Sequence, residues 1–437
     1  MEQRRKNLTQ LFIPICLETL LYMLSGMVDT LMLSSVNDQA VGAVGTANTY
    51  IIMFSVISSG MVAVMTQNIG AGRPGVAYQA RQLGLAFNAV LGIIMSLFLS
   101  LGAGTILSGV GVADALMQPA KTYLQIVGGF CILNALIPIC SSYLRAFGFS
   151  KEPLYASIIG NVINFCLNAF FLFVLHKGVA GVATATVISR IINLVIVVLL
   201  GAVLVKAKQH PERESNRAVM GQIIRIGLPS ACETAIYNVS MTLVIRFLNQ
   251  MDAQGLNVTA RSYTMQITNF SYCVGAALAQ ANAIMTGWHI GAKEYDACDR
   301  GTRKAAIIGV IVAVILETMF ALCSGWIMQL FSKDPQMVSL VGKLLAIDIV
   351  LEMGRVTNLV YGQALKTSGD AVFPVVMGAC FMILCSVGGT YLFGIRLGLL
   401  AVGAYIGMAG DECVRAVGMY LRWKSGKWKE KGLVKSR

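Results

Sequence analysis

Long apolar stretches separated by short polar loops dominate the pattern along the chain. Twelve of these stretches are long enough to cross a hydrocarbon layer of about 30 Å. They lie near residues 9–34, 42–69, 83–107, 120–145, 154–176, 179–204, 221–246, 259–287, 304–329, 338–362, 373–395 and 398–421. The pattern therefore predicts an all-α polytopic membrane protein with twelve transmembrane helices, six in each half.

The second half of the chain repeats the first. At one constant offset, Leu144, Arg145, Gly148 and Pro153 recur as Leu365, Lys366, Gly369 and Pro374. At a slightly shorter offset, Pro14, Glu18, Thr19, Tyr22 and Ser25 recur as Pro229, Glu233, Thr234, Tyr237 and Ser240. Because six crossings are an even number, both copies should enter the membrane in the same direction. We expect two six-helix lobes related by a parallel pseudo-two-fold repeat.

Polar segments divide this scaffold into parts. The expected N-lobe comprises residues 1–205, and the long polar segment 206–220 is the expected cytoplasmic linker between the lobes. The expected C-lobe follows at 221–421, and a basic cytoplasmic tail occupies 422–437.

Composition and charge support the membrane class and set the orientation. Hydrophobic residues make up 56% of the 437 residues and charged residues only 13%, against roughly 25% charged residues in a typical soluble domain. Most of the 34 Lys and Arg residues fall in the terminal segments and in the loops on the same side, which predicts that both termini are cytoplasmic. The net charge of +13 then indicates contact with anionic lipid headgroups of a bacterial-type cytoplasmic membrane, and no nucleic-acid partner.

Several sequence patterns argue against an enzyme. The segment 70–75 matches G-x-G-x-x-G by letter, but it follows a membrane span, precedes no βαβ unit and contains Pro74. No P-loop is present, and no nucleophile–base or metal-binding constellation lies within the spans. We therefore expect no catalytic residue and no cofactor, and an ion gradient as the source of energy.

A polar stripe marks the first span. Steps of four, three and four residues place on one helical face Glu18, Tyr22, Ser25 and Asp29. The seventh span repeats three members of the stripe, whereas Val244 stands where the first span has Asp29. A charged side chain at the membrane centre costs about 2.5–3.5 kcal/mol, so each one should face a cavity or a partner. Asp29 is the predicted coupling-ion site; the alternative is a capped or paired carboxylate near the outer mouth.

Two amides in the fifth span extend this asymmetry. Asn164 and Asn168 are one turn apart, and their counterparts are Cys385 and Gly389. Their oxygens could bind Na⁺ together with Asp29, or the amides could hydrogen-bond a protonated Asp29. Interhelical hydrogen bonding with a structural role is the competing interpretation. No other metal site is expected.

Charged residues also follow one face of the tenth span and one face of the twelfth. The tenth contains Asp348, Glu352 and Arg355, and the twelfth contains Asp411, Glu412 and Arg415. We expect Arg355 to pair with Glu352 and Arg415 to pair with Asp411, either as structural pairs or as relay charges. A role in the substrate cleft or in gating is predicted for Glu18, Tyr22, Glu233, Tyr237, Glu352 and Arg355. A structural or relay role is predicted for Asp348, Asp411, Glu412 and Arg415. Because acids outnumber bases, the cavity should favour cations.

An ordered set of short motifs resembles the multidrug and toxic compound extrusion (MATE) family over essentially the whole chain. These motifs are Val28-Asp29-Thr30-Leu31-Met32, Leu144-Arg145-Ala146-Phe147-Gly148, Asn164-x-x-x-Asn168, Gly227-Leu228-Pro229-Ser230, Leu365-Lys366-Thr367-Ser368-Gly369-Asp370 and Asp411-Glu412. The resemblance implies a two-lobed transporter that exchanges H⁺ or Na⁺ for amphipathic organic cations. It also implies an N-lobe cation site at Asp29, Asn164 and Asn168.

The chain departs from its relatives at three of their functional positions. Some relatives have Asp in place of Asn168, and others have Glu in place of Tyr237 and Asp in place of Arg355. Whether Glu233 and Glu352 replace those acids, and whether the coupling ion is H⁺ or Na⁺, are left open by the sequence.

Together these observations predict a monomeric cation-coupled antiporter that exports drugs or toxic organic cations by alternating access. One alternative is a flippase for a lipid-linked or amphipathic metabolite, which should show a basic rather than an acidic cavity. The other is an intramembrane enzyme, for which the spans supply no catalytic constellation.

Overall fold

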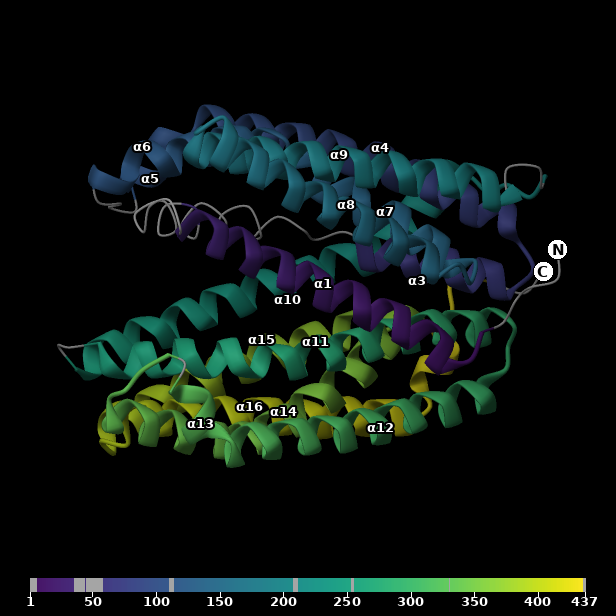
Figure 1. The fold of residues 1–437 in the computed structure, drawn as a ribbon. Coiled ribbons are helices and arrows are strands. Elements are labelled where there is room, and N and C mark those ends of the chain that lie inside the picture. Colours follow the sequence, from purple (N-terminus) through teal and green to yellow (C-terminus); the bar gives the residue numbers. More distant parts are fainter. Residues whose placement is uncertain are drawn as a thin grey trace. The chain divides into compact units, whose positions relative to one another are not determined.

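The computed structural model describes residues 6–34, 44, 58–109, 114–206, 211–252, 255–329 and 331–434. Every regular element within these residues is a helix (Figure 1). The chain divides into two compact units: unit 1 comprises residues 1–69 and 73–224, and unit 2 comprises residues 70–72 and 225–437. Each unit has an apolar core of its own, formed around Leu99 and Leu124 in unit 1 and around Val244 and Leu344 in unit 2.

Unit 1 is a bundle of long helices with several short breaks. Its elements are α1 (Leu8–Ser34), α3 (Ser58–Gly70), α4 (Pro74–Leu101), α5 (Ala103–Gly109), α6 (Asp114–Tyr123), the π-helical η1 (Leu124–Gly128), α7 (Ile132–Ala146), α8 (Lys151–Ala169), the π-helical η2 (Phe170–Val174) and α9 (Gly178–Leu204). Helix α8 packs against α1 and α9, and α7 packs against α4 and α9. This packing brings the first and fifth predicted spans into contact.

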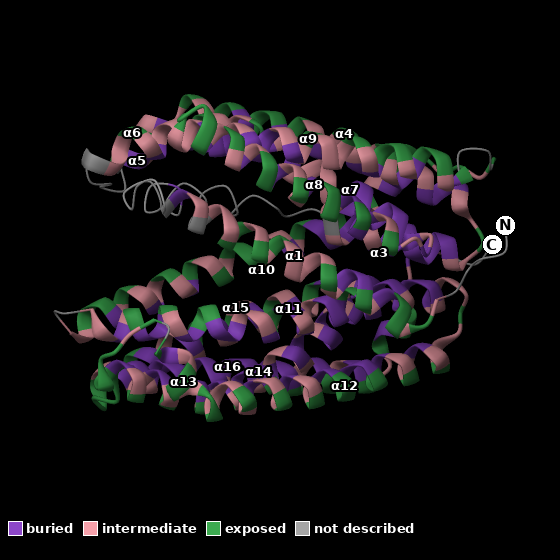
Figure 2. Cartoon of the chain, in the orientation of Figure 1, coloured by how far each residue is buried: buried purple, intermediate pink, exposed green. Residues whose placement is uncertain are grey.

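Unit 2 is arranged around one central helix. Its elements are α10 (Asn216–Met251), α11 (Leu256–Gly291), α12 (Tyr295–Leu322), α13 (Ser324–Met328), α14 (Pro335–Ser368), α15 (Val372–Phe381), the π-helical η4 (Met382–Val387) and η5 (Thr390–Arg396), α16 (Leu400–Lys424) and the 3-10 turn η6 (Lys427–Glu430). The start of α10, up to residue 224, belongs to unit 1. Helix α14 packs against α11, α12 and α16. Buried positions are accordingly frequent on α11, α14 and α16, as Figure 2 shows.

Local sequence signals account for the ends of α14. Asp334 caps its first turn by accepting a hydrogen bond from the Gln336 amide at 3.0 Å, and Pro335 occupies the first helical position. The helix ends at Gly369, whose φ of 99° lies in the left-handed region where glycine is favoured. The chain then turns directly into the next span.

Six helical segments of the described residues are long and apolar enough to cross a membrane. They are Leu8–Asp29, Pro74–Leu101, Lys151–Val174, Gly178–Leu204, Tyr295–Leu322 and Val372–Arg396. A seventh crossing results if Leu116–Gly128 and Ile132–Ala146, which meet at a bend of 42°, are taken as one span. The predicted spans near 221–246, 259–287, 338–362 and 398–421 coincide with the more polar helices α10, α11, α14 and α16. Most of the predicted span 42–69 lies outside the described residues, so the total of twelve stays a prediction.

Several breaks in the helices recur at the spacing seen in the sequence. Helix α4 ends at Leu101 and α12 ends at Leu322, which are related by the same offset as Arg145 and Lys366, and each is followed by a short helix after one residue. The π-helical segments η2 and η5 also fall at corresponding places, immediately before α9 and α16.

Both segments that were predicted to be polar connections are packed onto their units. In the linker, the Gln79 side chain donates to the Glu214 carbonyl at 2.7 Å, and Arg73 pairs with Glu214 at 2.7 Å. At the C-terminus, α16 continues to Lys424, and Trp428 is only 1% exposed. Its ring stacks on Trp423 at a centroid distance of 4.1 Å.

Candidate functional site

The three residues predicted to form the coupling-ion site come together in unit 1. Asp29 lies near the end of α1, whereas Asn164 and Asn168 project from α8. The Asn168 amide nitrogen donates to Asp29 Oδ1 at 2.6 Å and to Asn164 Oδ1 at 3.2 Å. Asn168 is completely buried and Asp29 is partly exposed. The carboxylate is therefore accessible from one side and held by an amide on the other.

Two further features complete the chemistry of this group. The guanidinium of Arg190 on α9 interacts electrostatically with the Asp29 carboxylate. Asn168 Oδ1 is buried and has no hydrogen-bond partner among the described residues. The site thus combines one carboxylate, two amide oxygens and a nearby positive charge. Such oxygen donors suit a proton or a hard monovalent cation.

Glu18 and Tyr22, two other members of the polar stripe, do not join this site. Glu18 forms an ion pair with Arg145 of α7, with Oε2 and Nη2 separated by 2.5 Å, and its other oxygen faces Ser157 at 3.5 Å. Tyr22 is 65% exposed. Glu18 is therefore held between helices, whereas Tyr22 points away from the interior of the unit.

Unit 2 contains the same ion pair at the repeated positions. Glu233 on α10 pairs with Lys366 on α14, and Oε2 and Nζ are separated by 2.5 Å. Tyr237, the counterpart of Tyr22, is 37% exposed. The sequence repeat identified Glu233 with Glu18 and Lys366 with Arg145, but it did not indicate that the members of each set are bonded to one another.

The charged residues of the tenth and twelfth predicted spans form one network in unit 2. Both expected pairs are present: Arg355 contacts Glu352 at 2.7 Å, and Arg415 contacts Asp411 at 2.8 Å. Glu412 joins the two pairs, because it lies 2.9 Å from Arg415 and 3.6 Å from Arg355. The network therefore ties α14 to α16.

Neutral side chains bind two acids of this network, and one oxygen of a third acid has no hydrogen-bond partner in the described part of the chain. The Asn358 amide donates to Glu412 at 3.0 Å, and the Ser386 hydroxyl donates to Asp411 at 3.0 Å. Asp348 is 2% exposed, and its Oδ2 has no hydrogen-bond partner among the described residues. Asp348 therefore differs from Glu352 and Asp411, each of which pairs with an arginine.

Sequence reasoning missed one acid of unit 2. Glu317 on α12 is completely buried, and neither of its carboxyl oxygens has a hydrogen-bond partner in the described part of the chain. It lies among the charges of Asp348, Glu352 and Arg355. Glu317 belongs to no polar stripe, but the cost of a charge inside an apolar span would have been a sufficient signal.

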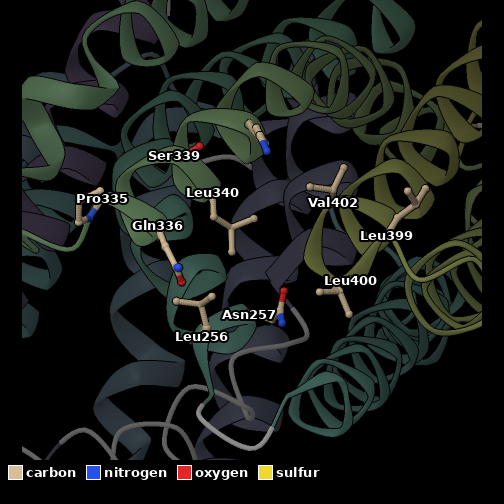
Figure 3. Close-up of a pocket in the computed structure, with 10 residues that line it drawn as sticks. Leu256, Asn257, Pro335, Gln336, Ser339, Leu340, Leu399, Leu400 and Val402 are labelled. Carbon is tan, nitrogen blue, oxygen red and sulfur yellow. The ribbon is translucent and has the colours of Figure 1, made fainter.

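A surface cavity of about 520 Å³ lies elsewhere in unit 2 and contains none of the predicted site residues. Figure 3 shows its wall, formed by the first turns of α11, α14 and α16, with Leu256, Gln336, Leu340 and Leu400 among the lining residues. Asn257, also in the wall, is 2% exposed and is bound to Asp252 and to the Ala401 amide.

Comparison with known proteins agrees with the residues that resemble a transporter family. A family model described as MatE matches residues 14–170 and 229–392. The protein named Uncharacterized transporter YisQ from Bacillus subtilis (strain 168) is 33% identical over 431 residues, which cover 96% of this chain and 94% of that protein. The Probable multidrug resistance protein NorM of Thermotoga maritima is 24% identical over 457 residues, covering 98% and 94%.

Solved structures show the same fold. The crystal structure of MATE in the bent conformation superimposes with a TM-score of 0.87 at 18% identity, covering 97% of this chain and 96% of that chain. The outward-facing conformation of a multidrug resistance MATE family transporter superimposes with a TM-score of 0.86 at 18% identity, covering 98% and 96%. Since the family model matches most of the chain and the relatives match it nearly end to end, this protein belongs to the MATE family of membrane transporters.

Proposed function

We propose that this protein is an H⁺- or Na⁺-coupled antiporter that exports small amphipathic organic cations by alternating access. The observation that carries the proposal is the contact between Asp29 and Asn168 in unit 1. An isolated acid inside an apolar helix needs a partner, and here the partner is an amide that accepts as well as donates.

The arrangement of the Asn168 amide depends on whether a proton or a cation is bound to Asp29. With Asp29 ionised and empty, the Asn168 NH₂ group faces the carboxylate. If the amide were flipped end for end, its oxygen would face the carboxylate, and the two oxygens would repel unless a proton or a cation lay between them. Binding of the ion would therefore favour a different arrangement of α1 and α8, which is the requirement for coupling an ion to a conformational change.

The scaffold proposed for this exchange has twelve crossings in two lobes of six, residues 1–205 and 221–421, joined by the linker 206–220. The family model matches each half once, and breaks in the helices recur at the spacing of the sequence repeat. In this arrangement both termini, including the basic segment 422–437, are cytoplasmic, and the protein works as a monomer in the cytoplasmic membrane.

The balance of charge inside the protein supports the proposed substrate class. In unit 2, the acids that are buried beside Arg355 and Arg415 are Glu317, Asp348, Glu352, Asp411 and Glu412. Even when protons neutralise the acids that lack a counter-charge, this interior holds no excess of positive charge, which disfavours anionic substrates such as pyrophosphate-linked lipids.

Uptake of a fluorescent organic cation into proteoliposomes tests the proposal, with the pH gradient and the Na⁺ gradient imposed separately. The wild-type protein should respond to one gradient, and Asp29→Asn should abolish that response. Asp296→Asn is the matched control, because it makes the same change at an exposed acid at the start of α12. Gradient-driven uptake that persists unchanged in Asp29→Asn would reject Asp29 as the coupling site.

A further inference from the structure

Among the described residues, the buried acid with the fewest hydrogen-bond donors around it lies in unit 2, whereas the Asp29 site belongs to unit 1. Glu317 is 0% exposed, and both of its carboxyl oxygens lack hydrogen-bond partners among the described residues. It is positioned by α12, which packs against α11 and α14. Ser271 of α11 faces it without forming a regular hydrogen bond. A carboxylate in such a setting would lose its hydration without receiving donors in return.

The surrounding charges do not supply the missing compensation. From α14, Glu317 is faced by Asp348, Glu352 and Arg355. Arg355 already contacts Glu352 at 2.7 Å and Glu412 of α16 at 3.6 Å. The guanidinium that faces Glu317 is therefore shared among acids that lie closer to it.

The charge balance of the whole cluster leads to the same result. It contains five acids and two arginines, and Arg415 is occupied by Asp411 and Glu412. If all five acids were ionised, three negative charges would be buried without a counter-ion. Burial of one unpaired charge costs several kcal/mol, so a carboxyl group in this position binds a proton instead.

Unpartnered oxygens indicate where such protons are held. Besides the two of Glu317, Asp348 Oδ2 and Glu352 Oε1 are buried without hydrogen-bond partners in the described chain. Asp348 and Glu352 are one turn apart on α14, on the side that faces α12. The titratable groups that face these two acids from the other helices are Tyr272 of α11 and Tyr405 and Glu412 of α16.

We propose that Glu317, Asp348 and Glu352 form a proton-binding site in unit 2, separate from Asp29, in which Glu317 carries a proton at neutral pH. The ligand is a proton rather than a metal cation, because a proton needs only one carboxyl oxygen. A metal cation needs several oxygen ligands, and Glu352 already uses one of its oxygens to pair with Arg355. The site extends the proposed function, since a transporter with this cluster binds cations in both units. Protonation of Glu317 itself does not depend on what the protein transports.

Infrared spectroscopy of the full-length protein in lipid nanodiscs tests the assignment. The carbonyl stretching band of protonated carboxyl groups is compared near neutral pH for wild type, Glu317→Gln, Asp29→Asn and the control Asp296→Asn. We expect Glu317→Gln to remove part of the band, and Asp296→Asn to leave it unchanged. A Glu317→Gln spectrum equal to that of wild type would overturn the proposal. So would a band that disappears when NaCl replaces choline chloride, because the site would then bind a metal cation.

Thermal unfolding provides a second readout that does not depend on spectral resolution. Glutamine has the shape of a protonated glutamate. The thermal unfolding midpoint of Glu317→Gln should therefore be close to that of wild type near pH 5. When an acid is protonated in the folded state and ionised in the unfolded state, the folded protein loses stability as the pH rises above the pKa of that acid in the unfolded chain, about 4.3. The midpoint of Glu317→Gln should therefore rise relative to wild type between about pH 5 and pH 8. A constant difference, or a variant that fails to fold, would mean that the carboxylate is ionised and structural.

The two proposals fail in different ways. Loss of gradient-driven uptake in Asp29→Asn with an unchanged infrared band in Glu317→Gln would reject only the unit 2 site. An infrared band that is reduced in Glu317→Gln, combined with full uptake in Asp29→Asn, would reject only the role of Asp29.

Discussion

Asp29 in unit 1 and Val244 in unit 2 occupy equivalent positions of the repeat, and their surroundings differ completely. Asp29 is partly exposed and bonded to the amide of Asn168 at 2.6 Å. Val244 is 0% exposed and belongs to an apolar core cluster. The acids that are buried beside arginine in unit 2 lie instead on α12, α14 and α16, and they are partly neutralised by Arg355 and Arg415. A duplicated scaffold can therefore place its ionisable groups independently in each copy.

In contrast, the ion pairs Glu18–Arg145 and Glu233–Lys366 occupy equivalent positions in the two units. Both join the first helix of a unit to the helix that precedes the turn at Gly148 or Gly369. Their presence in both units points to a role in holding each bundle together. Ion pairs that are present in both units are more readily explained by a role in folding. An ionisable group that is present in only one unit is more readily explained by ion binding.

The largest expected effect is produced by copying the acid of unit 1 into unit 2. Val244→Asp should destabilise the protein by roughly 5 kcal/mol, because a carboxyl group would replace a fully buried aliphatic side chain without a donor. Val244→Ala is the control for lost volume alone. The thermal unfolding midpoints in detergent of both variants provide the measurement. If Val244→Asp were as stable as Val244→Ala, the two positions would be alike in environment and the contrast would not hold.

Breaking one shared ion pair should have the next largest effect. Arg145→Met leaves Glu18 without its partner and should cost about 3 kcal/mol of unfolding free energy. Lys366→Met should cost a similar amount in unit 2. The double variant Glu18→Gln/Arg145→Met should regain most of the loss, since no unpaired charge remains. A double variant as unstable as the single one would show that the arginine acts through packing rather than through the pair.

The amide of Asn168 should have a smaller and more specific effect. Asn168→Ala removes the donor to Asp29, and a hydrogen bond to a charged group contributes about 1.5–3 kcal/mol. Because the lost bond favours the ionised carboxylate, the pH midpoint of proton-driven uptake should rise by about one to two units. Asn164→Ala should shift it less, because Asn164 contacts Asp29 only through Asn168. Equal pH midpoints of uptake for Asn168→Ala and wild type would show that the amide does not act on the ion site.

The tyrosines of the two stripes should matter least for stability. Tyr22→Ala and Tyr237→Ala should each change the unfolding free energy by no more than about 0.5 kcal/mol, because the side chains are 65% and 37% exposed. Any effect on uptake would then report contact with substrate rather than damage to the fold. A marked loss of stability in Tyr22→Ala alone would show that the stripes differ in packing as well as in charge.

The sequence contains much of the information on individual elements. Apolar length predicted spans that coincide with helices wherever the chain is described, and the step of three or four residues put Asn164 and Asn168 on one face of α8. It also marked Asp29 as an acid that has no acidic counterpart in the second half. These features are local, because a helix of known period fixes which of its own residues share a face.

Only the tertiary structure decided which faces meet. Glu18 and Arg145 are 127 residues apart and Asp29 and Asn168 are 139 apart, and no periodicity within one helix relates them. Glu317 shows the same limit, since its burial beside Asp348 and Glu352 follows from the packing of α12 on α14. Side-chain packing between helices sets these neighbours, and the charge of a site depends on every helix that contributes to it. The sequence by itself therefore determined the helices and the acid that breaks the repeat, whereas the partners of each acid were determined by the fold.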